Sequence, residues 1–260
     1  MKKAKKIIAI VLASSILASV IILQVFAVPN VLYADFEAID ICENQSASEI
    51  LSGLGIEDVF IENLSSDITE KISLASKAYS INETENDPSL SKNVWVLELS
   101  GGEYIILGTF EYRKMPVWRG TDVFAVSAND MVFNFSQCSV TAIYNEKTKN
   151  NGKQETVQKA EKSDNKLGGN HSVIFSYNLP NGIGAKCSDL KFLVVADAVV
   201  GHPSLPCSMM VNMHYSHQQF GTGFNGNCVD TDKETNPIYP QILYKTHTVR
   251  SQNFIEYKPQ

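Results

Sequence analysis

The residues with the clearest chemical potential are the histidines and aspartates between positions 202 and 232. His202, His214 and His217 carry imidazoles that could bind a metal ion or accept a proton. Asp230 and Asp232 add carboxylates that could join them. A set of this composition is typical of a hydrolase, metal-dependent or base-catalysed. These five residues are therefore the candidate catalytic and metal-binding residues.

The local pattern weighs against a shared metal ion in this segment. Apolar and polar residues alternate around His214 and His217, and a strand of that period places the two histidines on opposite faces. The acidic run that starts at Asp230 does not fit an EF-hand, because Thr235 and Gln241 stand where that loop needs glycine and glutamate. We therefore predict no cofactor and no assigned metal site.

Two other motif matches do not fit their surroundings. Residues 221–226 read G-x-G-x-x-G, but the segment that follows is a poor helix, and dinucleotide binding needs a helix N-terminus there. Three short motifs, which begin at Ser89, Ser163 and Lys245, follow the order S-x-x-K, S-D-N and K-T-G of penicillin-recognising serine enzymes. The first leads directly into a β-pattern instead of a helix, and His247 replaces the glycine of the third. The motifs thus do not predict an enzyme.

The first 34 residues predict export. Four lysines within the first six residues precede an apolar run from Ile7 to Val28, and Pro29 then leads into a short segment that ends at Ala34. This is the pattern of a signal peptide, with cleavage after Ala34 and a second possible site after Ala27. An apolar run of about 22 residues is also long enough to remain as a membrane anchor. In both cases the lysines stay inside and the rest of the chain is secreted or displayed at the cell surface, touching the membrane only through residues 7–28 if uncleaved.

The charge of the exported part limits its partners. Without the four N-terminal lysines, 18 Lys and Arg remain against 28 Asp and Glu, a net charge near −10. Such a chain lacks the basic surface that nucleic acids or anionic lipids require. The expected partner is an extracellular or cell-envelope ligand whose identity the sequence does not give.

Periodicity divides the rest of the chain into a helical segment and a β-rich domain. Between residues 35 and 90, a capping box at Ser46–Glu49, a second cap at Asp67 and apolar residues at helical spacing as far as Tyr79 predict three short helices. Residues 91–260 show alternating apolar residues and turn signals. They predict a mainly β fold, an antiparallel β-sandwich or partly open barrel preceded by the short helical segment and the N-terminal signal or anchor helix.

About ten short strands are expected in the β-rich domain. Gly101-Gly102 predicts a tight hairpin between the first two, which cover residues 94–99 and 104–113. The later candidates are residues 122–126, 131–135, 138–144, 172–177, 190–199, 208–217, 242–249 and 253–257. The segment at about 145–170 is rich in lysine and poor in apolar residues, which predicts a mobile polar loop.

The cysteines allow one disulfide hypothesis. If strands 190–199 and 208–217 pair antiparallel, Cys187 and Cys207 lie at opposite ends, too far apart for a bridge. Cys228 would fall at the same end as Cys187, so a Cys187–Cys228 bridge is predicted. Cys138 alternates with apolar neighbours and is expected to be a buried free thiol.

Together these observations favour an exported β-rich protein with a binding or structural role. The alternative is an exported hydrolase, possibly metal-dependent, that uses the histidines and aspartates of residues 202–232.

Overall fold

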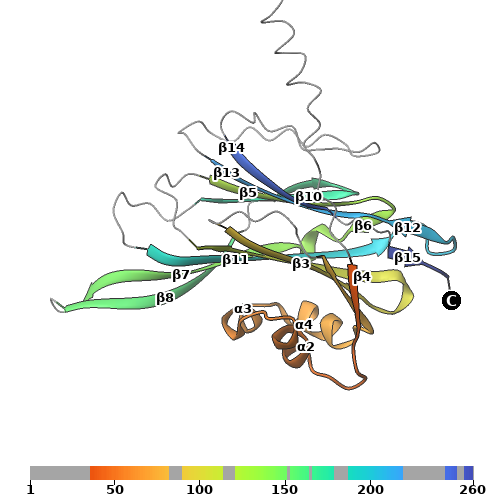
Figure 1. The fold of residues 1–260 in the computed structure, drawn as a ribbon, viewed down its shortest axis with the longest axis horizontal. Coiled ribbons are helices and arrows are strands. Elements are labelled where there is room, and N and C mark those ends of the chain that lie inside the picture. The colour runs from red at the N-terminus through yellow and green to blue at the C-terminus, as the bar shows by residue number, and fades with distance from the viewer. Residues whose placement is uncertain are drawn as a thin grey trace, which may run out of the picture. The chain divides into compact units, whose positions relative to one another are not determined.

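The computed structural model describes residues 36–81, 90–113, 121–150, 153–163, 166–178, 187–218, 244–250 and 255–259. The described residues are mainly β-strands in antiparallel sheets, with three short α-helices (Figure 1). The predicted signal or anchor segment, residues 1–34, lies outside them. Among the described residues, none of the helices combines the length and the apolar character needed to span a membrane.

The larger sheet has eight strands in the order β1-β2-β3-β4-β11-β7-β8, and β6 also pairs with β11. Its strands are β1 (Phe36–Asp40), β2 (Lys77–Ile81), β3 (Leu90–Glu98), β4 (Glu103–Tyr112), β6 (Met131–Phe133), β7 (Ser139–Asn150), β8 (Lys153–Ser163) and β11 (Cys187–Val200).

The smaller sheet has five strands in the order β14-β13-β5-β10-β9. Its strands are β5 (Thr121–Ala128), β9 (Lys166–Gly169), β10 (Ser172–Asn178), β13 (Val211–Gln218) and β14 (Tyr244–Arg250). A third pair consists of β12 (Cys207–Met209) and β15 (Ile255–Tyr257). The described strands do not close into a barrel, because each of the two main sheets ends in two different edge strands.

The main core lies between the two sheets. Side chains of the smaller sheet form successive rows across β10, β5 and β13, because residues paired in register point to the same face. One row is aliphatic, with Val126 and Met213, and the next is aromatic, with Phe124 and Tyr215. The sheets approach closely at Gly108 of β4, where an added Cβ would overlap the Met213 sulfur. Glycine at this position therefore leaves room for the opposite sheet.

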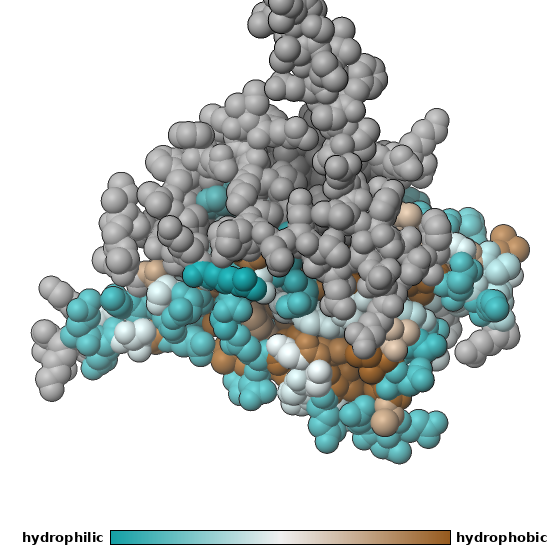
Figure 2. All heavy atoms as spheres, in the orientation of Figure 1, coloured by the Kyte–Doolittle hydropathy of each residue, from teal (hydrophilic) through white to brown (hydrophobic). Residues whose placement is uncertain are grey.

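A layer of three helices covers the other face of the larger sheet (Figure 1). These are α2 (Ala47–Gly53), α3 (Asp58–Glu62) and α4 (Ser66–Ser73). Helices this short are unstable alone, so their packing against the sheet stabilises them. Figure 2 shows hydrophilic residues on the outer part of this layer and along the β7–β8 hairpin, with hydrophobic residues gathered where the helices meet the sheet.

The local helix signals are largely confirmed. The capping box is present: Glu49 N donates to Ser46 Oγ at 3.2 Å, and Ser46 N donates to Glu49 Oε2 at 2.8 Å. The cap of α4 is Ser65, not Asp67. The helical spacing through Tyr79 was misleading, because the chain turns into β2 at Lys77. Since β1 and β2 both join the larger sheet, residues 35–90 are not a purely helical appendage.

The hairpin prediction at the glycine pair is confirmed. The 3₁₀ turn η1 (Ser100–Gly102) connects β3 to β4, and Glu98 pairs with Tyr104 across it. Gly101 and Gly102 have φ angles of 71° and 78°, in the left-handed region that glycine adopts without strain.

Residues 145–170 differ from the predicted polar loop. Most of them belong to β8, β9 and the outer half of β7, and β7 pairs with β8 from Val140 to Asn150. A low apolar content predicts poor burial, and this hairpin is indeed largely exposed. Its backbone is nevertheless paired, because β7 is already anchored on β11 and offers a free edge to β8.

One pairing assumed for the disulfide hypothesis is wrong. The strand that contains residues 190–199 lies in the larger sheet, and residues 211–218 lie in the smaller one. Local periodicity marks strands but carries no information about which sheet each one joins.

One buried hydroxyl in the main core has no hydrogen-bond partner in the described structure. Tyr104 is fully buried, and its Oη is unsatisfied. We expect Tyr104→Phe to raise the free energy of unfolding by about 1 kcal/mol, since it removes a desolvated group that makes no bond. Chemical denaturation of the wild type and the variant measures this change in the free energy of unfolding. Tyr79→Phe is the matched control, because the Tyr79 hydroxyl donates a hydrogen bond to Glu98 at 2.6 Å. Loss of that hydrogen bond is expected to lower the free energy of unfolding. Destabilisation by Tyr104→Phe would show that this hydroxyl does have a partner.

Candidate functional site

Four polar side chains meet at one end of the two main sheets; we call them the strand-end cluster. They are Tyr112 at the end of β4, Asp122 at the start of β5, and Tyr215 and His217 on β13. Asp122 is fully buried and lies beside His217 in register. Asp122 lies two residues before Phe124 on β5, so it is next to the aromatic row on the same face of the sheet. The space between the sheets therefore changes from apolar to polar at this end.

Asp122 accepts hydrogen bonds from three directions. His217 Nδ1 lies 2.6 Å from its Oδ1, and the hydroxyls of Tyr215 and Tyr112 lie 2.8 Å and 3.3 Å from its Oδ2. The two tyrosine hydroxyls also contact each other. Because Tyr112 belongs to the larger sheet and the other three residues to the smaller one, the cluster joins the two sheets.

The protonation states follow from burial and from these bonds. Burial raises the pKa of Asp122, while the hydrogen bonds from His217 and the tyrosines oppose that rise. Burial and the nearby Asp122 charge raise the pKa of Tyr112 and Tyr215 well above the usual range, so both hydroxyls stay protonated and act as donors. His217 Nδ1 faces Asp122, so Nε2 is the ring nitrogen that this contact leaves for another partner.

A second carboxylate joins the sheets near the same end. Glu161 of β8 accepts from Tyr144 of β7 at 2.6 Å and from Tyr177 of β10 at 2.8 Å. Tyr177 is the register partner of Asp122, which places the two sheet-to-sheet contacts next to each other. The end of the two sheets is therefore fixed by two acid–tyrosine groups.

The structure separates the three candidate histidines. His202 is exposed in the turn after β11, beyond Val200 and away from the strand-end cluster. His214 is buried on the face of β13 opposite to His217, as the alternation indicates. His217 is joined to the carboxylate of Asp122. Asp230 and Asp232 lie outside the described residues.

The cysteine predictions have different outcomes. Cys138 is buried, as expected. Cys187 is buried at the start of β11, but Cys228 lies outside the described residues, so the Cys187–Cys228 bridge stays a prediction. Among the described side chains, no group of three or more His, Cys, Asp or Glu is arranged to hold a metal ion.

The reactivity of the Cys138 thiol tests whether this side chain is buried in solution. Its thiol donates to Asn134 O at 3.2 Å, and burial raises its pKa to about 11. In the native protein at neutral pH we expect Cys138 to react with iodoacetamide about 100-fold more slowly than the exposed Cys42, because the thiolate is the reactive form. Peptide mapping after timed labelling measures both rates. Equal rates would contradict the buried placement.

A small recess lies on the helical face of the larger sheet. Its volume is about 70 Å³, below the roughly 300 Å³ at which ligand pockets begin, so it suits water or a single small group. Lys191 in its wall is already paired with Glu57 and Glu111. The lining residues are Gly55, Glu57, Phe60, Ser91, Asn93, Thr109, Phe110, Glu111, Lys191 and Phe192.

Comparisons with known proteins do not assign the chain to a family. No family model matches it, and no curated protein matches it. One similar solved structure contains manganese lipoxygenase of Gaeumannomyces graminis together with part of zonadhesin of Komagataella pastoris. The identity is 12%, the match covers 70% of this chain and 66% of that one, and the TM-score is 0.25. The chain thus spans slightly less than two thirds of that protein, and a likeness this low supports no statement about fold or function.

The sequence identified one member of the strand-end cluster and missed the others. His217 is a candidate in the sequence because of its residue type. Asp122, 95 residues away in sequence, carries no local signal. An aspartate that opens an otherwise apolar strand is the one feature that could have drawn attention to it.

Proposed function

We propose that the chain is an exported binding protein, secreted or held at the cell surface, in which the two main sheets form a β-sandwich. Its ligand would be an extracellular or cell-envelope molecule, bound at the end of the sheets that carries the strand-end cluster. The observation that carries the proposal is the hydrogen bonding of buried Asp122 to residues of both sheets.

This arrangement supports binding because side-chain hydrogen bonds join the ends of the two sheets there. In the smaller sheet, Thr121 pairs with Asn178 and Asp122 pairs with His217, so the ends of β5, β10 and β13 lie side by side. Tyr112, at the end of β4 in the larger sheet, reaches this end through its hydrogen bond to Asp122. Binding residues in sheet proteins are commonly held by connections at such ends, positioned by a rigid framework. The acid–tyrosine contacts supply that framework here, and His217 adds a group that can bond a ligand.

The export part of the proposal rests on residues 1–34. Their lysines and apolar run favour a signal peptide or an anchor, and the net charge of the remaining chain suits an extracellular setting better than one on nucleic acid. A retained anchor would make the membrane contact through residues 7–28.

The test is to express the full chain with its own N-terminus and to analyse the exported product. We expect it outside the cytoplasm, either beginning at residue 35 or still attached to the membrane, and N-terminal sequencing distinguishes the two. The same material is then screened against cell-envelope glycans and peptides, where specific binding without turnover is expected. An intact chain dissolved in the cytoplasm would contradict the export part.

One observation favours an exported hydrolase as a second candidate. The His217–Asp122 contact is the arrangement by which a carboxylate orients an imidazole for proton transfer. A hydrolase would turn over one of the screened compounds, with a rate that falls sharply in His217→Gln. Turnover of this kind would replace the binding proposal.

A further inference from the structure

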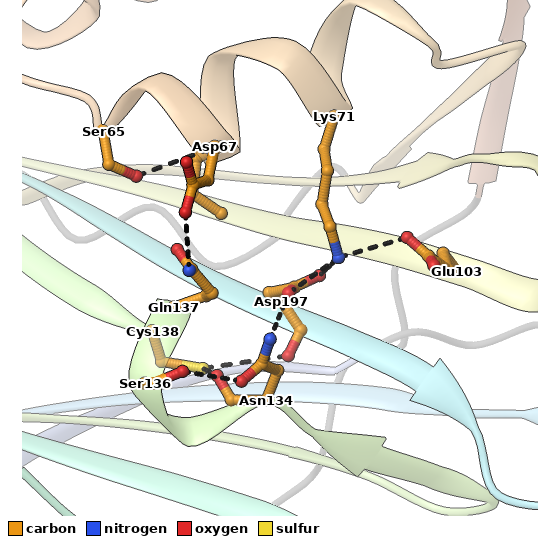
Figure 3. Close-up of polar contacts among 10 residues, drawn as sticks. Ser65, Asp67, Lys71, Glu103, Asn134, Ser136, Gln137, Cys138 and Asp197 are labelled. Atoms are coloured by element: carbon orange, nitrogen blue, oxygen red, sulfur yellow. Dashed lines mark hydrogen bonds and ion pairs between the residues drawn. The ribbon is translucent and has the colours of Figure 1, made fainter.

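A buried aspartate on the helical side of the larger sheet brings an amine and a carboxamide together (Figure 3). The Asp197 side chain on β11 is 2% exposed. Lys71 of α4 donates to its two oxygens at 3.0 Å and 2.9 Å. Asn134, next to the 3₁₀ turn η2 (Phe135–Gln137), donates its Nδ2 to Asp197 Oδ2 at 3.0 Å. The amine and the amide therefore share one carboxylate oxygen.

Asn134 is held through its backbone as well as through its carboxamide. Its backbone N–H donates to Asp197 O at 2.8 Å, which fixes the residue against β11. The Ser136 hydroxyl donates to the amide oxygen, Asn134 Oδ1, at 2.9 Å. A donor in this position stabilises the negative charge that builds on the oxygen when a nucleophile attacks Cγ.

We propose that Lys71 and Asn134 become joined by an intramolecular isopeptide bond, with Asp197 as the proton carrier. The arrangement contains each part that this reaction needs: an amine, an acceptor for its proton, a carboxamide and a donor to the carbonyl oxygen. Holding the reacting groups on one buried residue supplies the proximity that free lysine and asparagine side chains lack.

The step balances without any other reactant. Asp197 takes one proton from the Lys71 ammonium, and the neutral Nζ attacks Cγ of Asn134. A second proton passes from the attacking nitrogen to Nδ2, the Cγ–Nδ2 bond breaks, and the leaving ammonia collects the first proton from Asp197 as ammonium. One carbon–nitrogen bond forms, one breaks, and nothing is oxidised or reduced.

The starting charge state is compatible with a slow reaction. Burial lowers the pKa of Lys71, but its hydrogen bonds to Asp197 and Glu103 raise it by more, so the ion pair is the main state. A small neutral fraction is sufficient, because the bond forms once in each molecule and the ammonia is lost. The product links the helical layer covalently to the sheet.

The test is the intact mass of the purified full chain, followed by peptide mapping. We expect the wild-type mass to be one ammonia below the mass calculated from its own N-terminus, and a tryptic fragment in which the Lys71 and Asn134 peptides are joined. Lys71→Arg keeps the ion pair but cannot form the bond, and Asp197→Asn removes the proton carrier. Both are expected to show the full mass.

Two further variants separate the chemistry from a structural role. Ser136→Ala changes an exposed residue and is expected to slow the mass loss in freshly made protein. Lys191→Arg is the matched control: Lys191 also links the helical layer to the sheet, but its partners are the carboxylates of Glu57 and Glu111, so the mass loss should persist. A full wild-type mass with tryptic cleavage at Lys71 would overturn the proposal. So would loss of ammonia confined to the Asn134 peptide, which indicates a succinimide.

Discussion

Asp122→Ala is expected to lower the free energy of unfolding by about 3–5 kcal/mol, the range seen when one partner of a buried charged contact is removed. The substitution leaves the donors of Tyr112, Tyr215 and His217 without their acceptor, the fully buried Asp122 carboxylate. Each unsatisfied donor carries its own desolvation cost. Urea denaturation at neutral pH, followed by tyrosine fluorescence and circular dichroism, measures the change.

A matched control is available in the same chain. Asp40 on β1 has a side chain that is 91% exposed, and its Oδ1 lies 3.9 Å from Lys77 Nζ, a long and solvated ion pair. Asp40→Ala is expected to change the free energy of unfolding by less than about 0.5 kcal/mol. Equal effects of the two substitutions would mean that the strand-end cluster does not connect the sheets.

Phe124→Ala should have an effect of similar size from a different cause. Phe124 is fully buried at the centre of the aromatic row, with ring centroids 5.2 Å from Phe110, 4.8 Å from Phe192 and 5.0 Å from Tyr215. Its neighbours come from both sheets, so the cavity cannot close without moving one sheet toward the other. Loss of the ring is expected to cost about 3–5 kcal/mol in unfolding free energy.

Leu205→Ala is the control for Phe124→Ala, because it shortens a hydrophobic side chain outside the core. Leu205 is 59% exposed in the turn after β11, and its truncation should cost under about 0.5 kcal/mol. A small effect of Phe124→Ala would contradict the packing between the two sheets. Because Phe124 and Asp122 lie close together on β5, their double variant is expected to deviate from additivity.

The parts of the fold that depend on neighbouring residues could be predicted from the sequence. The capping box at Ser46 and the glycine pair at Gly101 each work through groups within a few residues, and both are present. Strand periodicity also marked most of the strands, including the one with His214 and His217 on opposite faces. None of these signals requires knowledge of a distant partner.

The parts of the fold and of the site that depend on residues far apart in the sequence could not be predicted from it. His217 is recognisable by type, but its role depends on Asp122, and only the pairing of β13 with β5 brings the two together. The sequence alone predicts that Lys71 is a solvent-facing residue of a helix. The structure shows that it binds Asp197 on β11. The β7–β8 hairpin was missed for a related reason: it is stabilised by an existing sheet edge and not by burial of its own side chains.

The measurement that tests the central claim most directly is ligand binding by the exported chain with and without His217. The wild type, His217→Gln and the matched control His202→Gln would be applied to the same array of cell-envelope glycans and peptides. We expect specific binding by the wild type, unchanged affinity for His202→Gln, and a loss of about tenfold or more for His217→Gln, or roughly 1.4 kcal/mol. Equal binding by all three proteins, with His217→Gln folded as stably as the wild type, would show that the strand-end cluster is not the binding site.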